Sequence, residues 1–210
     1  MELIPIVDEN LEIKGFAEKR WAEKIRLCHL TVLLIPVRCE DHKVAVQIRP
    51  KGASYAGRHD FFGGHVSLDE EFWGLLLGEK VDVTSLVWST AMREANEELQ
   101  VTRADCYPEI ITEQHLTIIG KIGDFPWNGI HNVERSTLFL VKIPKGCSIH
   151  PMEGAGGRSV RVKTEFFSLY EVMDKFEDHW DFADGAERIL LRFKEDRLLF
   201  EEIVQKIESL

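Results

Sequence analysis

The sequence lacks the features that mark several protein classes. Its 210 residues include four cysteines, with no Cys-x-x-Cys pair and no Cys/His spacing that suits a zinc site, so we expect free thiols in a reducing compartment. No run of about 18 apolar residues is present to span a membrane, and the acidic residues 1–10 do not resemble a signal peptide. We therefore predict a cytoplasmic protein that does not bind a membrane.

Basic residues are scarce relative to acidic ones. The chain has 26 Lys and Arg against 36 Asp and Glu, which gives a net charge of −10 at pH 7, and no cluster of five or more Lys or Arg occurs. Nucleic acid would meet net repulsion, so we expect no nucleic-acid partner. An acidic protein that binds phosphate groups usually recruits a divalent cation to do so. At 44% hydrophobic and 30% charged residues, the composition is that of one folded domain over 1–210.

The hydrophobic pattern predicts strands interspersed with helices, which is an α/β or α+β layered fold. Apolar residues spaced by three and four predict an amphipathic helix at 84–99 with Thr84 as its N-cap, and the same spacing predicts a helix at 16–28. Strands 30–37 and 44–48 should form a hairpin. Further strands are predicted at 3–7, 115–122, 136–143 and 160–167, and further helices at 169–177 and 184–208.

One helix carries an unusual concentration of charge. Glu94, Glu97 and Glu98 stand at i, i+3 and i+4, so their carboxylates crowd one face of the helix at 84–99 and repel one another. Mg²⁺ or Mn²⁺ accepts such oxygen ligands and would offset the repulsion. Upstream, Gly63 and Gly64 permit backbone torsions closed to other residues, so a carbonyl can turn towards a metal or a phosphate. A solvated acidic face and an ordinary turn are the alternatives for each feature taken alone.

Together, and in this order, the two features resemble the Nudix box of the Nudix hydrolase superfamily. In the family pattern a glycine, five residues and a glutamate precede a helical Arg-Glu-x-x-Glu-Glu segment. Gly64 and Glu70 match the first part, and residues 93–98 match the second. The chain departs from the pattern twice. The 22 residues 71–92 replace the usual seven, an insertion of 15, and Gln100 stands where the family has glycine.

The resemblance implies a fold and an activity. The fold would be a single Nudix-type α/β/α sandwich with a mixed sheet, its core at about 28–172, followed by C-terminal helices at about 169–208. The activity would be hydrolysis of a diphosphate linkage in a nucleoside-diphosphate-type or related small molecule, with Mg²⁺ or Mn²⁺ as cofactor. Such a divalent ion bridges the diphosphate and activates a water molecule.

The resemblance also implies roles for individual residues. Metal ligands would be Glu94, Glu97 and Glu98 together with the Gly63 carbonyl. Arg93 would orient a carboxylate, that of Glu70, because an Arg–carboxylate pair fixes geometry through two parallel hydrogen bonds. The general base varies within the superfamily. Its candidates here are Glu97, Glu98, Glu113, Glu134 and Glu153.

Other residues offer contacts to substrate or partner. Arg49 and Arg58 belong to a basic loop that enters the box, and His65 follows the glycines, so all three are candidate phosphate-binding residues; solvated loop charges are the alternative. Trp127 would stack a nucleobase or anchor the core. The apolar segment 72–77 of the insertion would pack on the core or form a homodimer contact.

The N-terminal region, with His29 leading into an apolar strand, resembles the isopentenyl-diphosphate isomerase branch of the same superfamily. That enzyme uses a cysteine at the position of Gly63, and no cysteine of this chain lies near this loop. The residues therefore favour water attack on a diphosphate. Two alternatives remain in view, an isomerase-like enzyme and a non-catalytic Nudix-fold nucleotide sensor.

Overall fold

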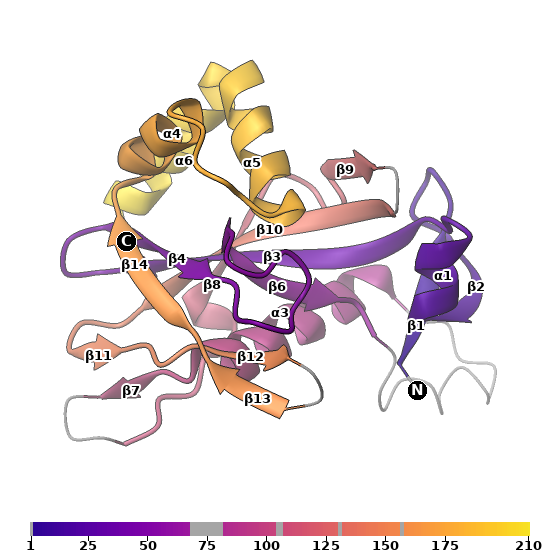
Figure 1. Ribbon diagram of the computed structural model, residues 1–210, viewed down its shortest axis with the longest axis horizontal. Coiled ribbons are helices and arrows are strands. Elements are labelled where there is room, and N and C mark those ends of the chain that lie inside the picture. The colour runs from indigo at the N-terminus through magenta and orange to yellow at the C-terminus, as the bar shows by residue number, and fades with distance from the viewer. Residues whose placement is uncertain (1, 68–81, 104–106, 130–131, 156–157) are drawn as a thin grey trace.

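The computed structural model describes residues 2–67, 82–103, 107–129, 132–155 and 158–210. Within them a mixed sheet of ten strands forms the centre of the molecule (Figure 1). Its strands are β1 (Leu3–Val7), β2 (Ile13–Glu18), β3 (His29–Arg38), β4 (Lys43–Ile48), β5 (His59–Asp60), β6 (Phe62–His65), β8 (Leu116–Ile119), β9 (Phe125–Asn128), β10 (Val133–Ile143) and β14 (Lys163–Phe167).

Two small ribbons and the helices complete the structure. The ribbons pair β7 (Thr102–Arg103) with β11 (Cys147–Ser148), and β12 (Met152–Ala155) with β13 (Arg158–Arg161). The described helices are α1 (Lys19–Lys24), α3 (Val83–Leu99), α4 (Leu169–Glu177), α5 (Asp184–Glu195) and α6 (Arg197–Glu208), with a 3₁₀ turn η1 (Glu113–His115). None of these described helices combines the length and apolar character needed to cross a membrane.

Strand β3 organises the sheet because it has neighbours along both edges. It runs parallel to β10 along its whole length, from His29 opposite Glu134 to Arg38 opposite Ile143. On its other edge it pairs antiparallel with β6 and β4. Nine of its ten residues are buried, which fits a strand covered on both faces.

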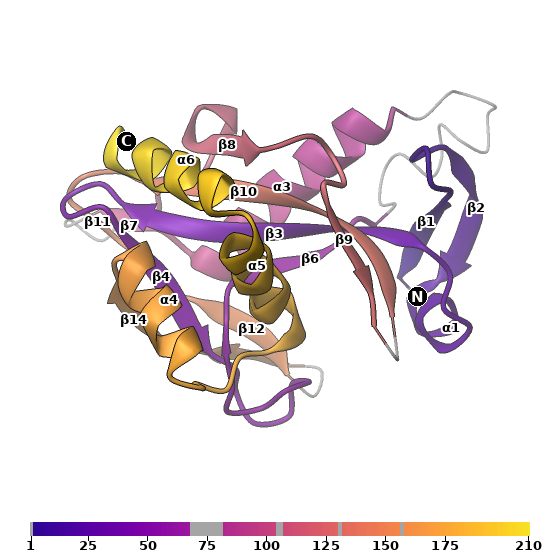
Figure 2. The ribbon, with the colours of Figure 1, turned by 90° about the horizontal axis from the view of Figure 1, so that it is seen from above.

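Helices cover both faces of this sheet. Leu33, Ile35 and Val37 of β3 join the hydrophobic cluster beneath α4, α5 and α6, whereas Leu30 and Val32 join the cluster beneath α3. Figures 1 and 2 show α3 on one side of the sheet and the three C-terminal helices on the other. The predicted α/β/α sandwich with a mixed sheet is therefore confirmed, and the C-terminal extension packs on the domain itself.

Several predicted elements needed correction. The predicted helix at 16–28 is wrong in its first part, because residues 13–18 form β2 and pair with β1, and α1 covers only Lys19–Lys24. The N-cap of α3 is Asp82 and not Thr84: the Asp82 carboxylate accepts the backbone N–H groups of Thr84 and Ser85. The predicted helix at 184–208 is two helices, since the Asp196 side chain caps α6 by accepting the N–H of Leu199.

Gln100, which replaces the family's glycine, ends α3. Its backbone is left-handed, at φ 44° and ψ 63°, the conformation that glycine adopts most easily at the end of a helix. The helix therefore ends at a residue with a Cβ in a backbone conformation that favours glycine. Glu70 and the apolar segment 72–77 lie outside the described residues.

Candidate active site

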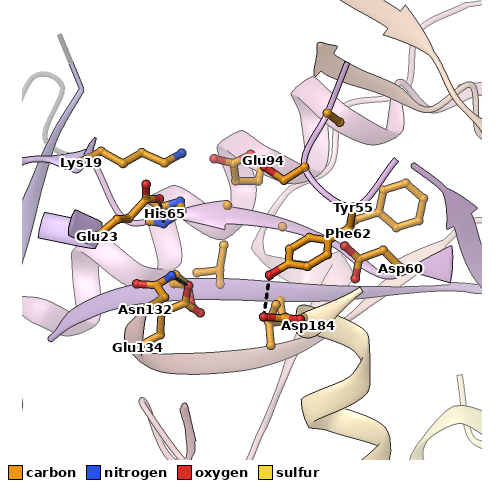
Figure 3. Close-up of a pocket in the computed structure, with 18 of the residues that line it drawn as sticks. Lys19, Glu23, Tyr55, Asp60, Phe62, His65, Glu94, Asn132, Glu134 and Asp184 are labelled. Atoms are coloured by element: carbon orange, nitrogen blue, oxygen red, sulfur yellow. Dashed lines mark hydrogen bonds and ion pairs between the residues drawn. The ribbon is translucent and has the colours of Figure 1, made fainter. Parts of the chain in front are cut away.

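A cleft of about 1270 Å³ opens over β3 and β6, between α1, the 50–58 loop and the start of α5 (Figure 3). Eight carboxylates line it against four Lys or Arg side chains. The acidic residues of the lining are Glu2, Glu18, Glu23, Asp60, Glu94, Glu98, Glu134 and Asp184, and the basic ones are Lys19, Arg20, Arg49 and Arg188. Such a surface attracts cations and repels a free diphosphate.

Each of the two glycines of β6 is required because another part of the chain lies too close for a Cβ. Gly63 has φ 137°, and a Cβ placed on it would lie 2.1 Å from the carbonyl oxygen of Val32 in β3. A Cβ on Gly64 would lie 2.4 Å from Oε1 of Glu94. Glycine at the first position lets β6 pair with β3, and glycine at the second makes room for a carboxylate of α3.

Carboxylates of α3 meet this strand. The backbone N–H of Gly63 donates to Oε2 of Glu98 at 3.0 Å, and Glu94 reaches the cleft beside Gly64 (Figure 3). The Glu94 side chain is 12% exposed, and this burial raises its pKa, although the neighbouring Arg93 opposes the shift. A divalent cation would stabilise the ionised form of this carboxylate.

Glu97 stands apart from the other two. Its side chain is 61% exposed and pairs with Arg93 at 3.3 Å, and among the described residues it is not part of the cleft lining. Arg93 also pairs with Oε1 of Glu94 at 3.0 Å and donates to Oγ of Ser67 at 3.0 Å. The described ion-pair partners of Arg93 are thus Glu94 and Glu97, whereas its expected partner Glu70 lies outside the described residues.

The three candidate phosphate-binding residues have different positions. Arg49 lines the cleft, where its Nη1 pairs with the buried carboxylate of Asp60 at 2.9 Å. Arg58 is not among the described lining residues; its Nε pairs with Asp181 at 3.2 Å. His65 lines the cleft, and burial lowers its pKa well below the usual value, so the imidazole is neutral at pH 7.

A second group of potential metal ligands was not anticipated. His29, His65 and Glu134 each offer one ligand atom, and these atoms lie within 4.8 Å of one another. The two imidazole rings stack at 5.1 Å. Nδ1 of His29 hydrogen-bonds to the carbonyl of Leu27 at 2.8 Å, while its Nε2 is buried without a hydrogen-bond partner among the described residues. A buried nitrogen of this kind is suited to a metal ion.

Strand register explains this cluster. Glu134 of β10 stands directly opposite His29 of β3, and His65 of β6 stands opposite Thr31, two residues further along β3. Of the three candidate general bases outside α3, Glu134 therefore reaches the cleft. Glu113 lies on η1 and, within the described chain, is not part of the lining, and the side chain of Glu153 is outside the described set.

No protein-family model matches the sequence. No curated protein matches it either. Solved structures do. The crystal structure of DR0079 from Deinococcus radiodurans aligns over 91% of this chain and 98% of its own, with a TM-score of 0.55 and 14% identity. A NUDIX hydrolase from Alicyclobacillus acidocaldarius aligns over 79% of this chain and 90% of its own, with a TM-score of 0.52 and 13% identity. The chain has the Nudix fold.

The C-terminal extension of this Nudix fold contributes to the cleft, which the sequence pattern did not reveal. Asp184, Gly185 and Arg188 of α5 line it, and Oδ2 of Asp184 accepts a hydrogen bond from the Tyr55 hydroxyl at 2.6 Å. Figure 3 shows this pair on the far side of the cleft from His65. Burial and the contact with Asp184 raise the pKa of Tyr55 to about 12, so the phenol stays protonated. Trp127 of β9 also lines the cleft.

Proposed function

We propose that the protein is a metal-dependent hydrolase that cleaves a diphosphate linkage in a nucleoside-diphosphate-type or related small molecule. The excess of carboxylates in the cleft carries this proposal. A diphosphate would be repelled by eight acidic side chains facing four basic ones, unless divalent cations came between them. The Nudix fold and the position of Glu94 and Glu98 beside Gly63 support the same reading.

Mg²⁺ or Mn²⁺ fits the donors that meet at β6. Glu94 and Glu98 provide carboxylate oxygens, Glu97 is the third carboxylate on the same helical turn, and we assign the Gly63 carbonyl as a further ligand. The raised pKa of Glu94 fits a carboxylate whose charge is balanced by a cation. Bound there, the ion would supply charge neutralisation at the diphosphate and an acidified water molecule.

The imidazole-containing group is suited to a different ion. His29 and His65 are nitrogen ligands, which Mn²⁺ accepts more readily than Mg²⁺ does, and Glu134 adds an oxygen. The Nε2 atom of His29 that lacks a described partner fits such an ion. We therefore propose a Mn²⁺ site at this group, beside the carboxylate site of α3.

The chain's own residues would position and activate the reactants. Arg93 holds Glu94 and Glu97 in place through its ion pairs. Arg49, which lines the cleft and pairs with Asp60, is the basic loop residue that we assign to the phosphates, and Arg58 would bind only a substrate that extends beyond the cleft. Glu98 is our choice for the general base that takes a proton from the attacking water, because it lines the cleft and is fixed by the Gly63 N–H.

The test compares Glu97→Gln, Glu98→Gln and the double variant with the wild type. Products would be measured for nucleoside diphosphate sugars, dinucleoside polyphosphates, nucleoside triphosphates and prenyl diphosphates, each with Mg²⁺ and with Mn²⁺. Glu202→Gln is the matched control, because Glu202 is 60% exposed and pairs with Lys206 one turn away, as Glu97 pairs with Arg93. We expect the control to keep full activity. Undiminished turnover in both single variants would refute the assignment.

Two further assays of the wild-type protein distinguish the two alternative functions. Deuterium incorporated into carbon from heavy water, with isopentenyl diphosphate as substrate, would support an isomerase-like enzyme. Tight binding of a nucleotide derivative by calorimetry, without turnover of any compound in the screen, would support a sensor.

A further inference from the structure

We propose that Arg188, delivered by α5 of the C-terminal extension, is a substrate-binding residue that holds a phosphate oxygen in the cleft. Identification of the anion as a diphosphate rests on the proposed function, whereas the need for an anion rests on the surroundings of Arg188 itself. The guanidinium lines the cleft, and its side chain is 8% exposed.

Two nitrogens of this guanidinium lack a hydrogen-bond partner among the described residues. Arg188 forms an ion pair with Glu134, whose Oε2 lies 2.5 Å from its Nη1. Its Nε and Nη1 are buried and make no hydrogen bond of good geometry within the described part of the chain. An arginine has five N–H donors, and buried donors left without acceptors cost free energy. The side chain is thus placed for an acceptor that enters the cleft from outside.

The position of the guanidinium is fixed by its neighbours. It lies over the ring of Trp127 at 5.6 Å, and Glu134 holds its Nη1 end. A cation–π contact and an ion pair together restrict the rotamers of a long side chain, which lowers the entropy lost when a ligand binds. Glu134 is itself held, through Oε2, by the Thr31 hydroxyl at 3.3 Å.

A phosphate is the anion that this arrangement suits. The planar fork of arginine matches two oxygens of a phosphate, and the cleft's acidic lining excludes an anion that brings no metal ion with it. Glu94 and Glu134 enter the cleft from opposite sides (Figure 3). A diphosphate held by metal at the α3 carboxylates therefore has Arg188, which pairs with Glu134, on its other side.

Titration calorimetry with inorganic pyrophosphate in excess Mg²⁺ tests the role of Arg188 apart from catalysis. We expect Arg188→Gln to weaken pyrophosphate binding by roughly 10- to 100-fold, the effect of losing a charge-assisted hydrogen bond, and Arg188→Lys to weaken it less. Arg192→Gln is the control: Arg192 is on the same helix, is 52% exposed and pairs with Asp196. Its affinity should equal that of the wild type.

A purely structural role through Glu134 is tested in a second background. In Glu134→Gln the ion pair is already lost, so Arg188→Gln added to it leaves no unpaired buried carboxylate and removes only the bond to the ligand. We expect the further 10- to 100-fold loss to persist there. Equal affinity of Glu134→Gln and the double variant would overturn the proposal, as would a wild-type protein that does not bind pyrophosphate. Binding that depends on Arg188 in a protein without hydrolase activity would uphold it and refute the proposed reaction instead.

Discussion

Alanine substitutions at the two adjacent glycines of β6 should have opposite consequences. At Gly63 the new Cβ would meet backbone, 2.1 Å from the carbonyl oxygen of Val32, at a φ of 137°. Relief of this contact would require a shift of the β3 backbone, and the φ angle itself is unfavourable for alanine. Strain and overpacking together should lower the free energy of unfolding by roughly 2–5 kcal/mol, which is roughly 4–20 °C in melting temperature for a chain of this size.

At Gly64 the new Cβ would meet only the end of a flexible side chain. The contacted atoms are Oε1, Cδ and Oε2 of Glu94, at 2.4, 2.6 and 2.9 Å, and the carboxylate can rotate away. Gly64→Ala should therefore cost about 1 kcal/mol or less in stability. It should displace Glu94 and weaken Mn²⁺ binding at the α3 carboxylates by roughly 10- to 100-fold, as loss of a metal-positioning contact does, and leave the proposed site at His29, His65 and Glu134 unchanged.

Thermal unfolding in a chelator and Mn²⁺ titration of the folded variants measure the two effects separately. Gly57→Ala is the control for torsional strain alone, because Gly57 has φ 86° and nothing lies within 4 Å of the point that a Cβ on it would occupy. The difference between Gly63→Ala and Gly57→Ala then gives the cost of the clash with Val32. The reasoning fails if Gly64→Ala unfolds as readily as Gly63→Ala, or if it binds Mn²⁺ as the wild type does.

Three further substitutions test particular contacts. Burial raises the pKa of Glu94, so ionisation of this carboxylate lowers stability at a pH above the folded-state pKa and has no effect below the unfolded-state pKa. Glu94→Gln should therefore stabilise the metal-free protein at pH 7 but not at pH 4. Equal effects in denaturant titrations at both pH values would contradict this. Gln100→Gly should raise the free energy of unfolding by roughly 0.5–1 kcal/mol, because it removes the strain of a side chain at a left-handed backbone position, whereas Gln100→Ala should not. A gain in stability from alanine would contradict this explanation. Asp60→Ala should cost roughly 3–5 kcal/mol in chemical denaturation, because it leaves Arg49 without its carboxylate; a loss under about 1 kcal/mol would show that this ion pair contributes little.

Hydrophobic periodicity predicts those helices and strands whose own residues show which face is buried. Strand β3 contains a nearly continuous apolar run and α3 has an apolar stripe, so each is recognisable from its own residues. Residues 13–18 are harder to assign because Phe16 and Ala17 fit the helical spacing of 16–28, whereas pairing with β1 makes this segment a strand. Local pattern cannot contain that information.

The candidate site likewise contains some residues that the sequence motif predicts and others that only the tertiary structure brings together. Glu94, Glu98 and the two glycines belong to one sequence motif, so their meeting is predictable. His29 and Glu134 are more than a hundred residues apart, and only the parallel register of β3 and β10 brings them together. The position of Arg188 in the cleft is unpredictable for a related reason. It lies on an amphipathic helix, and the apolar face of that helix predicts only that it packs on the domain.

The long connection between β6 and α3 has a consequence for engineering. Both of its ends are anchored: the Val66 N–H donates to the Leu30 carbonyl at 3.0 Å, and Asp82 caps α3. Loop-closure entropy grows only with the logarithm of length, so residues added between two fixed ends cost little free energy. A reporter module inserted between these anchors should leave the carboxylates undisturbed, which would turn the chain into a scaffold for reading out ligand occupancy in living cells.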